Sequence, residues 1–371
     1  MSGAVVYARS IFEEDHAVFR ETVRRFLTEE VAPHLDQWRR GGGVGPRLWV
    51  SAAELGLLGT MAPEELGGGG VDDPRFVAML VEETMTAGAT GLAHLLALSC
   101  GVCLPALIEY ASVEQLTAWL EPVIEGRGPA VPVAVGPPLE AHADDGEWRL
   151  SGWAPAVPGG ASAALLVVGF STEGEDGVAV IDGDRLGLQR RSVADALGGR
   201  DAGQADIHFD DVRVGPGDVL ANGETVLRSI RRDLDLWTAV LAAAGALGVL
   251  TSTVEYVGSR RVFGRLLAEF ENTRHRLAEA AVLLTAAQLI VDDSVRARWA
   301  GTLSAGQAAA ARITAAQAHD EAVDRGLQLH GGYGYMREYP ISVAFADAQY
   351  LRQQERQVSD ARDVVAAGIG L

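Results

Sequence analysis

The chain has 371 residues, of which 48% are hydrophobic and 22% are charged, as is ordinary for a globular protein of two or three domains. Acidic residues outnumber basic ones by 50 to 31, all the basic residues are arginine, and the formal charge is −19. This acidity argues against nonspecific binding to nucleic acid or to an anionic membrane. The longest apolar stretch, 236–250, is too short to span a bilayer, and the N-terminus lacks a signal pattern. We therefore expect a cytoplasmic protein without membrane insertion.

The first third of the chain has the periodicity of helices. Apolar residues recur at three- and four-residue spacing in 18–31, 76–85 and 113–124. This pattern predicts an N-terminal α-helical domain over residues 1–128.

A mostly apolar run over 95–107 predicts a buried helix within this domain, and it contains the only cysteines, Cys100 and Cys103. The Cys-x-x-Cys spacing is found in zinc and redox sites, but no second pair or histidine cluster completes a tetrahedral set of ligands. We interpret both thiols as core packing and expect no metal, because free cysteine is commonly buried.

The pattern changes after Pro129. Polar and apolar residues alternate around Trp148, and runs rich in β-branched residues follow between Gly and Asp turns. These runs are 165–170, 178–181 and 207–214. They predict a small middle β domain, a sandwich or a barrel, over residues 129–222.

Helical patterns return after Asn222 and predict a C-terminal, four-helix-bundle-like domain over 223–371. One predicted helix carries an apolar stripe made of Phe263, Leu266, Leu267, Phe270, Leu277, Ala281 and Leu284. A second is predicted over 304–330, and a last one begins near Ala344. The fold class predicted for the whole chain is α+β.

Residues 328–340 read Gln-Leu-His-Gly-Gly-Tyr-Gly-Tyr-Met-Arg-Glu-Tyr-Pro and follow an alanine-rich helix. Because Gly331 and Gly332 lack a Cβ atom, a flat or anionic ligand can approach their main-chain N–H groups closely. Gln328 can donate and accept hydrogen bonds at once. This arrangement suits a nucleotide, although a plain helix stop closed by Pro340 would explain the glycines alone.

This segment resembles the C-terminal signature of the acyl-CoA dehydrogenase family, and further similar segments recur in order along the chain. They are 19–26, 30–33, 54–59, 63–68, 209–214 and the Arg-x-x-Phe-Gly element at 260–264. The resemblance implies FAD-dependent α,β-dehydrogenation of an acyl thioester, with the flavin between the β domain and the C-terminal helices. It also implies an acyl-CoA or acyl-carrier-protein thioester as substrate, an electron-transfer flavoprotein as acceptor, and a homo- or hetero-oligomer with a related chain.

Members of the family commonly carry a catalytic glutamate eight residues beyond an aspartate that follows the glycine signature. Here Asp347 leads to Glu355, so the resemblance implies Glu355 as the base that removes the α proton. Without the resemblance, Glu355 reads as a surface charge beside arginines, and Arg356 stands where the family usually has glycine. A base on an earlier helix, at Asp233 or Asp235, is the alternative.

The resemblance also implies which residues hold FAD, and in the family these reach across a subunit interface. They are Arg260, Phe263, Gln328, Gly331 and Gly332. By contrast, the loop that contacts the flavin ring is shortened at 135–142, and 153–158 lacks its usual polar anchors. Three roles follow: a self-sufficient enzyme, a subunit that completes a partner's FAD site, or a thioester-binding scaffold without redox chemistry.

Overall fold

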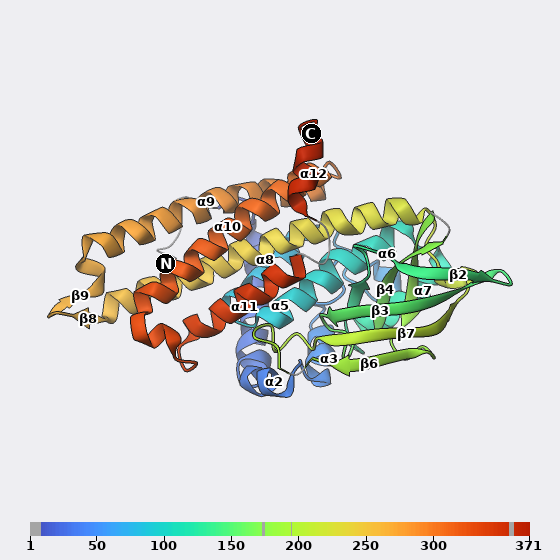
Figure 1. Cartoon of the computed structure of the whole chain (residues 1–371), viewed down its shortest axis with the longest axis horizontal. Helices are drawn as coiled ribbons and strands as arrows, with labels where there is room; N and C mark the ends of the chain where they lie inside the picture. Colours follow the sequence, from blue (N-terminus) through green and yellow to red (C-terminus); the bar gives the residue numbers. More distant parts are fainter. Residues whose placement is uncertain (1–8, 173–174, 194, 356–359) are drawn as a thin grey trace.

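A computed structural model describes residues 9–172, 175–193, 195–355 and 360–371. The molecule is elongated, with a β-sheet at one end and long C-terminal helices that run from this sheet to the opposite end (Figure 1). The N-terminal helices pack against the middle of these long helices. This arrangement confirms the predicted α+β class and the order of helical, β and helical regions.

The N-terminal region is helical, and the three helices predicted from periodicity are confirmed. Its α-helices are α1 (Glu14–Phe26), α2 (Leu35–Gly41), α3 (Pro46–Glu54), α4 (Pro74–Thr86), α5 (Thr90–Leu96), α6 (Leu104–Tyr110) and α7 (Val113–Ile124). Short helical turns of other types are η1 (Leu27–Val31), η2 (Glu64–Leu66) and η3 (Ala97–Cys103). Helix α7 begins at a capping box, in which Ser112 and Gln115 satisfy each other's backbone N–H groups.

The predicted buried helix is confirmed, since α5, η3 and α6 form one continuous buried helical segment. Cys100 and Cys103 are free and buried, and burial raises the pKa of the Cys100 thiol to about 12. Among the described residues there is no cluster of three metal-ligating side chains. The thiols therefore pack as small apolar groups.

Two helical segments, Thr90–Tyr110 and Gly223–Ser259, have the length and hydropathy of a membrane span. Their most apolar windows are 94% and 78% buried inside the protein. Core helices have the same property, because a helix that is packed on all sides is apolar all round.

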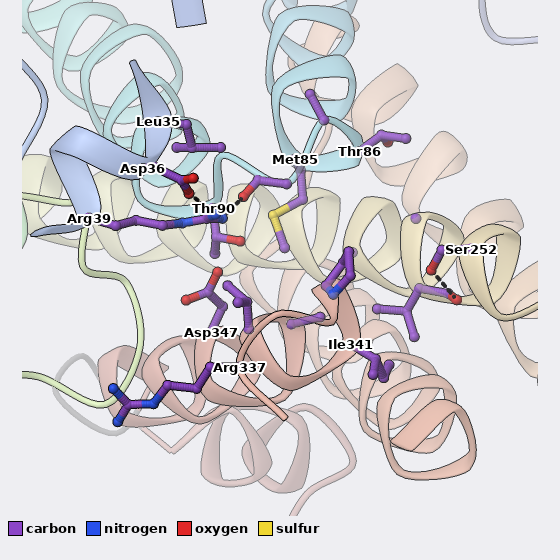
Figure 2. Close-up of a pocket in the computed structure, with 18 of the residues that line it drawn as sticks. Leu35, Asp36, Arg39, Met85, Thr86, Thr90, Ser252, Arg337, Ile341 and Asp347 are labelled. Atoms are coloured by element: carbon purple, nitrogen blue, oxygen red, sulfur yellow. Dashed lines mark hydrogen bonds and ion pairs between the residues drawn. The ribbon is translucent and has the colours of Figure 1, made fainter. Parts of the chain in front are cut away.

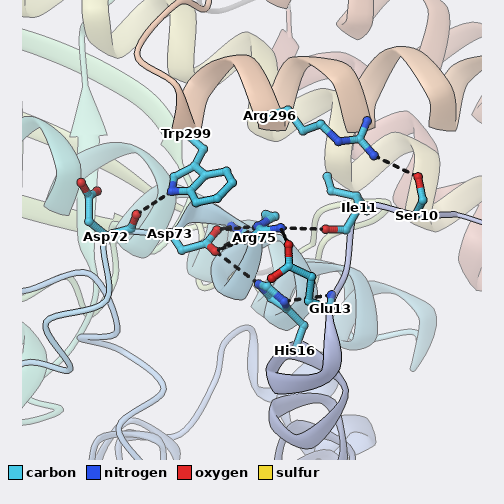
Figure 3. Close-up of polar contacts among 9 residues, drawn as sticks. All are labelled: Ser10, Ile11, Glu13, His16, Asp72, Asp73, Arg75, Arg296 and Trp299. Atoms are coloured by element: carbon cyan, nitrogen blue, oxygen red, sulfur yellow. Dashed lines mark hydrogen bonds and ion pairs between the residues drawn. The ribbon is translucent and has the colours of Figure 1, made fainter.

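A buried arginine joins the N-terminal segment to the rest of the protein (Figure 3). The Arg75 guanidinium donates to the Asp73 carboxylate, to Glu13 and to the backbone oxygen of Ile11. Its carbon atom also lies 4.1 Å from the ring centroid of Trp299, which belongs to the C-terminal region. Because this cation has several acceptors, its burial is compensated, and the cluster fixes the start of α1 against α4.

The middle region is one seven-stranded mixed sheet. Its strands are β1 (Ala130–Val133), β2 (Leu139–Asp144), β3 (Glu147–Val157), β4 (Leu165–Thr172), β5 (Glu175–Asp182), β6 (Leu188–Ser192) and β7 (Ala205–Val214). β5 pairs with one side of β4, β1 and β2 share its other side, and the order continues through β3 and β7 to β6. The loop predicted over 135–142 is shorter than expected, because its second half, from Leu139 onward, belongs to β2.

The C-terminal region contains α8 (Gly223–Ser259), α9 (Glu271–Trp299), α10 (Ala305–His330), η6 (Gly331–Tyr335), α11 (Pro340–Glu355) and α12 (Ala361–Gly368). The predicted helix over 304–330 is confirmed. Helix α8 packs directly on the buried helical segment. Gly101 lies so close to Trp237 of α8 that a Cβ atom added to it would be 2.4 Å from the indole. One end of α8 lies near the sheet, and its other end lies at the far end of the molecule (Figure 1).

The prediction of a single helix from Phe263 to Leu284 is wrong in its first part. Residues 261–266 form a hairpin of β8 (Arg261–Val262) and β9 (Arg265–Leu266), then η5 (Leu267–Glu269), and α9 begins only at Glu271. The turn residues Phe263 and Gly264 both have positive φ angles, 52° and 79°. Two successive residues of this kind make a tight hairpin turn, which a helix cannot contain.

Candidate functional site

A cavity of about 420 Å³ lies where the sheet meets the helices, and we call it the interdomain cavity. Its sheet wall consists of Pro132, Val133, Ala134, Val135, Pro137, Pro138, Leu139, Trp153, Ala154, Pro155, Val157 and Pro158. Its helical wall consists of His94, Leu98, Leu234, Thr238 and Gln354. Such a mostly apolar cleft between regions of a fold is where small ligands commonly bind.

The sheet wall contains both segments that depart from the family pattern. Prolines supply five of its residues and contribute no backbone N–H donor. The backbone oxygens of Val135 and Gly136 accept hydrogen bonds from Arg231, at 2.5 and 3.0 Å, so this loop is fixed against α8. Trp153 stacks on His208 and stays 54% exposed at the rim. This wall therefore offers shape and an aromatic surface, and few polar groups.

The helical wall has a different character, because it carries polar side chains that are fixed by neighbours. His94 Nδ1 lies 2.7 Å from the Tyr350 hydroxyl oxygen of α11. The Gln354 side-chain nitrogen lies 3.5 Å from the backbone oxygen of Ala156 in β3. Burial lowers the pKa of His94 to about 4, so the imidazole is neutral at physiological pH.

Glu355, the predicted base, is the last residue of α11 and directly follows Gln354. Its side chain, with Arg356 and Gln357, lies outside the described residues. The end of α11 therefore reaches the interdomain cavity, and the role of Glu355 as base remains a prediction.

The two alternative bases are engaged elsewhere. The Asp233 carboxylate accepts hydrogen bonds from Arg232 and Arg298, at 2.8 and 3.0 Å. Asp235 pairs with Arg312 at 2.6 Å, and burial raises the pKa of this carboxyl. Neither aspartate lines the cavity, whereas their neighbour Leu234 does. Both carboxylates have the geometry of structural ion pairs.

A pair of buried carboxyl groups fixes α11 in place. Asp347 is 4% exposed and accepts the backbone N–H of Gly199 at 2.8 Å. Burial, then the neighbouring Asp201, raise the pKa of Asp347 to about 7. Asp201 accepts the N–H of Leu92 at 3.0 Å, so the pair links α5, the loop before β7 and α11. Sequence analysis had singled out Asp347 only as a landmark for Glu355.

Asp347 also lines a second cavity, of about 470 Å³, between α2, the turn before α5, α8 and the start of α11 (Figure 2). Arg39 of α2 and Thr90 of α5 form one side of this second cavity, and Asp347 faces them from α11. The positive charge of Arg39 and a hydrogen bond from Thr90 lower the pKa of Asp347, but burial outweighs both.

The predicted FAD-binding residues lie together at the opposite end of the molecule, and we call this group the nucleotide end. It consists of Arg260, Phe263, Gln328, Gly331 and Gly332. The Arg260 guanidinium carbon lies 4.8 Å from the ring centroid of Tyr333, which brings the end of α8 beside the glycine turn. Within the described residues, no carboxylate forms an ion pair with Arg260, so its charge is available to an anion.

The nucleotide end is open. A Cβ atom added to Gly331 or Gly332 would meet no atom of the chain within 4 Å, and Gly331 has a φ of 57°. Phe263 is 94% exposed at the hairpin tip, and Gln328 is exposed on the last turn of α10. Exposed glycine backbone, beside an arginine that has no carboxylate partner among the described residues, forms a surface that fits a pyrophosphate.

The interdomain cavity and the nucleotide end lie far apart within one chain. Leu234 lines the interdomain cavity and Arg260 follows the end of the same helix, α8. Their separation in sequence corresponds to about 39 Å at a rise of 1.5 Å per residue. This span exceeds an extended dinucleotide, so one bound cofactor cannot contact both groups of the same chain.

Comparisons with known proteins agree with this architecture. The N-terminal domain of acyl-CoA dehydrogenases matches residues 13–127, and their C-terminal domain matches residues 236–355. Long-chain specific acyl-CoA dehydrogenase of Mus musculus mitochondria is 27% identical over 361 residues, which cover 92% of this chain and 83% of that protein.

Two solved structures show the same fold. An acyl-CoA dehydrogenase from Geobacillus kaustophilus is 24% identical with a TM-score of 0.90, covering 99% of this chain and 100% of its own. A glutaryl-CoA dehydrogenase from Mycobacterium smegmatis, in complex with FADH2, is 19% identical with a TM-score of 0.88, covering 97% and 95%. The chain belongs to the acyl-CoA dehydrogenase family, whose members are FAD-dependent oxidoreductases acting on CH–CH groups.

Proposed function

We propose that this chain catalyses FAD-dependent α,β-dehydrogenation of an acyl thioester in the interdomain cavity, with Glu355 as the base. One observation carries the proposal: the end of α11, at Gln354, lines an apolar cavity between the sheet and the helices. Desaturation between Cα and Cβ needs a base for the α proton and an acceptor for the β hydride. Bound FAD supplies the hydride acceptor.

Residues of the chain would abstract the proton, exclude water and position the base. Glu355 takes the α proton and holds it on a carboxyl oxygen while the Cα–Cβ double bond forms. Leu98 and Leu234, with the prolines of the sheet wall, exclude water from the cavity. The Asp347–Asp201 pair holds α11 so that its last residue stays at the cavity.

The nucleotide end fits the adenosine and pyrophosphate parts of FAD, and it would hold the cofactor of a neighbouring chain. Arg260 would pair with the pyrophosphate, Phe263 would pack on the cofactor, and the exposed backbone of Gly332 permits close approach. The 39 Å estimate along α8 supports this division between chains. An oligomer is therefore part of the proposal, with acyl-CoA or an acyl-carrier-protein thioester as substrate and an electron-transfer flavoprotein as acceptor.

The sheet wall favours a second candidate function. Because its flavin-facing segments lack hydroxyl groups and carry prolines, the chain could complete the FAD site of a related chain without a competent cavity of its own. In that hetero-oligomer, Arg260 and the glycine turn act on the partner's cofactor.

One experiment separates these functions. The chain is purified alone and after co-expression with a related chain, and flavin absorbance is measured with the reduction of an artificial acceptor by acyl-CoA thioesters. Flavin and turnover in the chain alone support the self-sufficient enzyme, and their appearance only with the related chain supports the second function. Acyl-CoA binding without flavin in either preparation contradicts both and indicates a scaffold.

A further inference from the structure

His94 is a buried polar side chain in an apolar cavity. It lies on α5, is 6% exposed, and shares the helical wall with Leu98, Leu234 and Gln354. A polar group in such a place costs stability unless it is hydrogen-bonded, so its bonding pattern determines what it can do.

Tyr350 fixes the orientation of this imidazole. The two rings meet edge to face, with centroids 5.5 Å apart and planes inclined at 68°. The Tyr350 hydroxyl oxygen is 2.7 Å from His94 Nδ1, and Tyr350 itself is 5% exposed. A contact at this distance between two buried side chains holds the ring in one place.

The same contact determines the tautomer. A buried phenol must donate its proton, and in the described part of the chain its hydrogen-bond partner is His94 Nδ1. Burial raises the pKa of Tyr350 and lowers that of His94 to about 4, so both groups are neutral at pH 7. Since Nδ1 accepts, the imidazole proton resides on Nε2.

The Nε2–H group of His94 is free to donate a hydrogen bond to a ligand. Nε2 forms no hydrogen bond within the described part of the chain, and the residues that line the cavity with His94 are mainly apolar. His94 stands on the same wall as Gln354, next to the proposed base. In the proposed function, the base at the end of α11 and a flavin at the sheet wall act from opposite sides of the substrate, so the helical wall faces the acyl group.

We propose that His94 is a specificity-determining residue whose Nε2–H donates a hydrogen bond to a neutral oxygen atom in the acyl chain of the substrate. The substrate class is an acyl thioester with a keto, ether or hydroxyl oxygen beyond Cβ. No arginine lies among the described lining residues to balance a carboxylate, so a neutral acceptor is the better match. This inference rests on the proposed function.

Binding of unreactive analogues tests the inference without turnover. The probes are octyl-CoA, a thioether without an acidic α proton, and octyl-CoA analogues with a ketone at carbon 5, 6 or 7. Dissociation constants are measured by calorimetry on the flavin-loaded assembly and on its His94→Leu, His94→Gln and Tyr350→Phe variants. We expect one ketone analogue to bind the unchanged protein about tenfold more tightly than octyl-CoA, the value of one hydrogen bond.

The variants identify the donor. His94→Leu removes the preference for the ketone analogue, His94→Gln retains part of it, and Tyr350→Phe weakens it. Equal binding of all probes to the unchanged protein, or a preference that survives in His94→Leu, overturns the inference while the proposed function stands. If no thioether binds, the proposed function fails as well.

The tautomer is a second, independent readout. The ¹⁵N resonances of His94, assigned by their loss in His94→Gln, report which ring nitrogen carries the proton. We expect the proton on Nε2 in the unchanged protein and a mixture of tautomers in Tyr350→Phe. A proton on Nδ1 in the unchanged protein overturns the inference.

Discussion

The interdomain cavity and the nucleotide end differ in how much of a binding site each provides alone. The cavity has walls from the N-terminal helices, the sheet and the C-terminal helices, so one chain shapes it on most sides. The nucleotide end has exposed glycine backbone and a nearly fully exposed Phe263, so one chain provides only one side of a site. The difference indicates that one chain can enclose a ligand in the cavity, whereas a ligand at the nucleotide end needs another molecule to cover it.

The largest effect is expected at the cavity, from Glu355→Gln. The amide keeps the size of the side chain but cannot accept the α proton, so turnover should fall by about 10²–10⁴-fold. Stopped-flow reduction of the bound flavin by acyl-CoA measures this step. Glu54→Gln, at an exposed glutamate that does not line the cavity, is the matched control and should retain full activity. Unchanged flavin reduction in Glu355→Gln would show that another group is the base.

The next effect is expected at the nucleotide end, from Gly332→Leu. A Cβ atom at this position would meet no atom of its own chain within 4 Å, so we expect the fold to be unaffected, but the leucine would occupy the space of the cofactor. We expect most of the flavin to be lost, as measured by absorbance after gel filtration. Gly306→Leu adds the same bulk at a position that is also open but lies at the start of α10, and this variant should retain flavin. Equal flavin content in both variants would contradict the assignment of the glycine turn.

A smaller effect is expected from Phe263→Ala at the hairpin tip. An exposed aromatic side chain contributes little to the stability of its own chain, but it can anchor an interface. We expect oligomer dissociation to become about tenfold easier in analytical ultracentrifugation, with unchanged far-ultraviolet circular dichroism. Leu186→Ala removes an equally exposed apolar residue at the sheet end and should have no effect. Equal dissociation in the two variants would exclude the hairpin from the interface.

The smallest effect concerns stability and pH, and it arises from Asp347. Its pKa is raised to about 7 in the folded protein, whereas an unfolded chain releases this proton near pH 4. The folded state thus binds the extra proton between these values, and its stability falls as the pH rises from about 4 to about 7. In Asp347→Asn this decrease should be smaller by roughly 2–3 kcal/mol, as measured by urea unfolding at pH 5 and pH 7.5.

Asp15→Asn is the control for this pH dependence, because Asp15 is exposed in the first turn of α1. Its unfolding free energy should follow the pH in parallel with that of the unchanged protein. If Asp347→Asn is also parallel to the unchanged protein, Asp347 does not bind the extra proton in the folded state.

The same comparison shows which features a sequence can predict. Long helices and the order of the three regions were predictable, because the spacing of apolar residues records which face is buried. The hairpin at 261–266 was missed, since Phe263, Leu266, Leu267 and Phe270 have the spacing of a helix stripe. The positive φ angles of Phe263 and Gly264 override that pattern, and Gly264 was the local signal that could have revealed the turn.

Contacts within the cavity were beyond prediction for a different reason. His94 and Tyr350 are 256 residues apart, and neither residue has a local pattern that marks it as functional. Asp201 and Asp347 likewise meet only through packing of the loop before β7 on α11. Family resemblance pointed to Glu355 and the nucleotide end, but the motifs that carry it do not include His94.

Complementation between two inactive variants tests the central claim that each working site combines the cavity of one chain with the nucleotide end of another. Glu355→Gln and Gly332→Leu chains are co-expressed, and the mixed oligomers are assayed for acyl-CoA-dependent acceptor reduction. A mixed pair contains one site with both halves intact, so we predict recovery of about one quarter of the normal activity for random pairing. Activity no higher than that of either variant alone would contradict a site shared between chains.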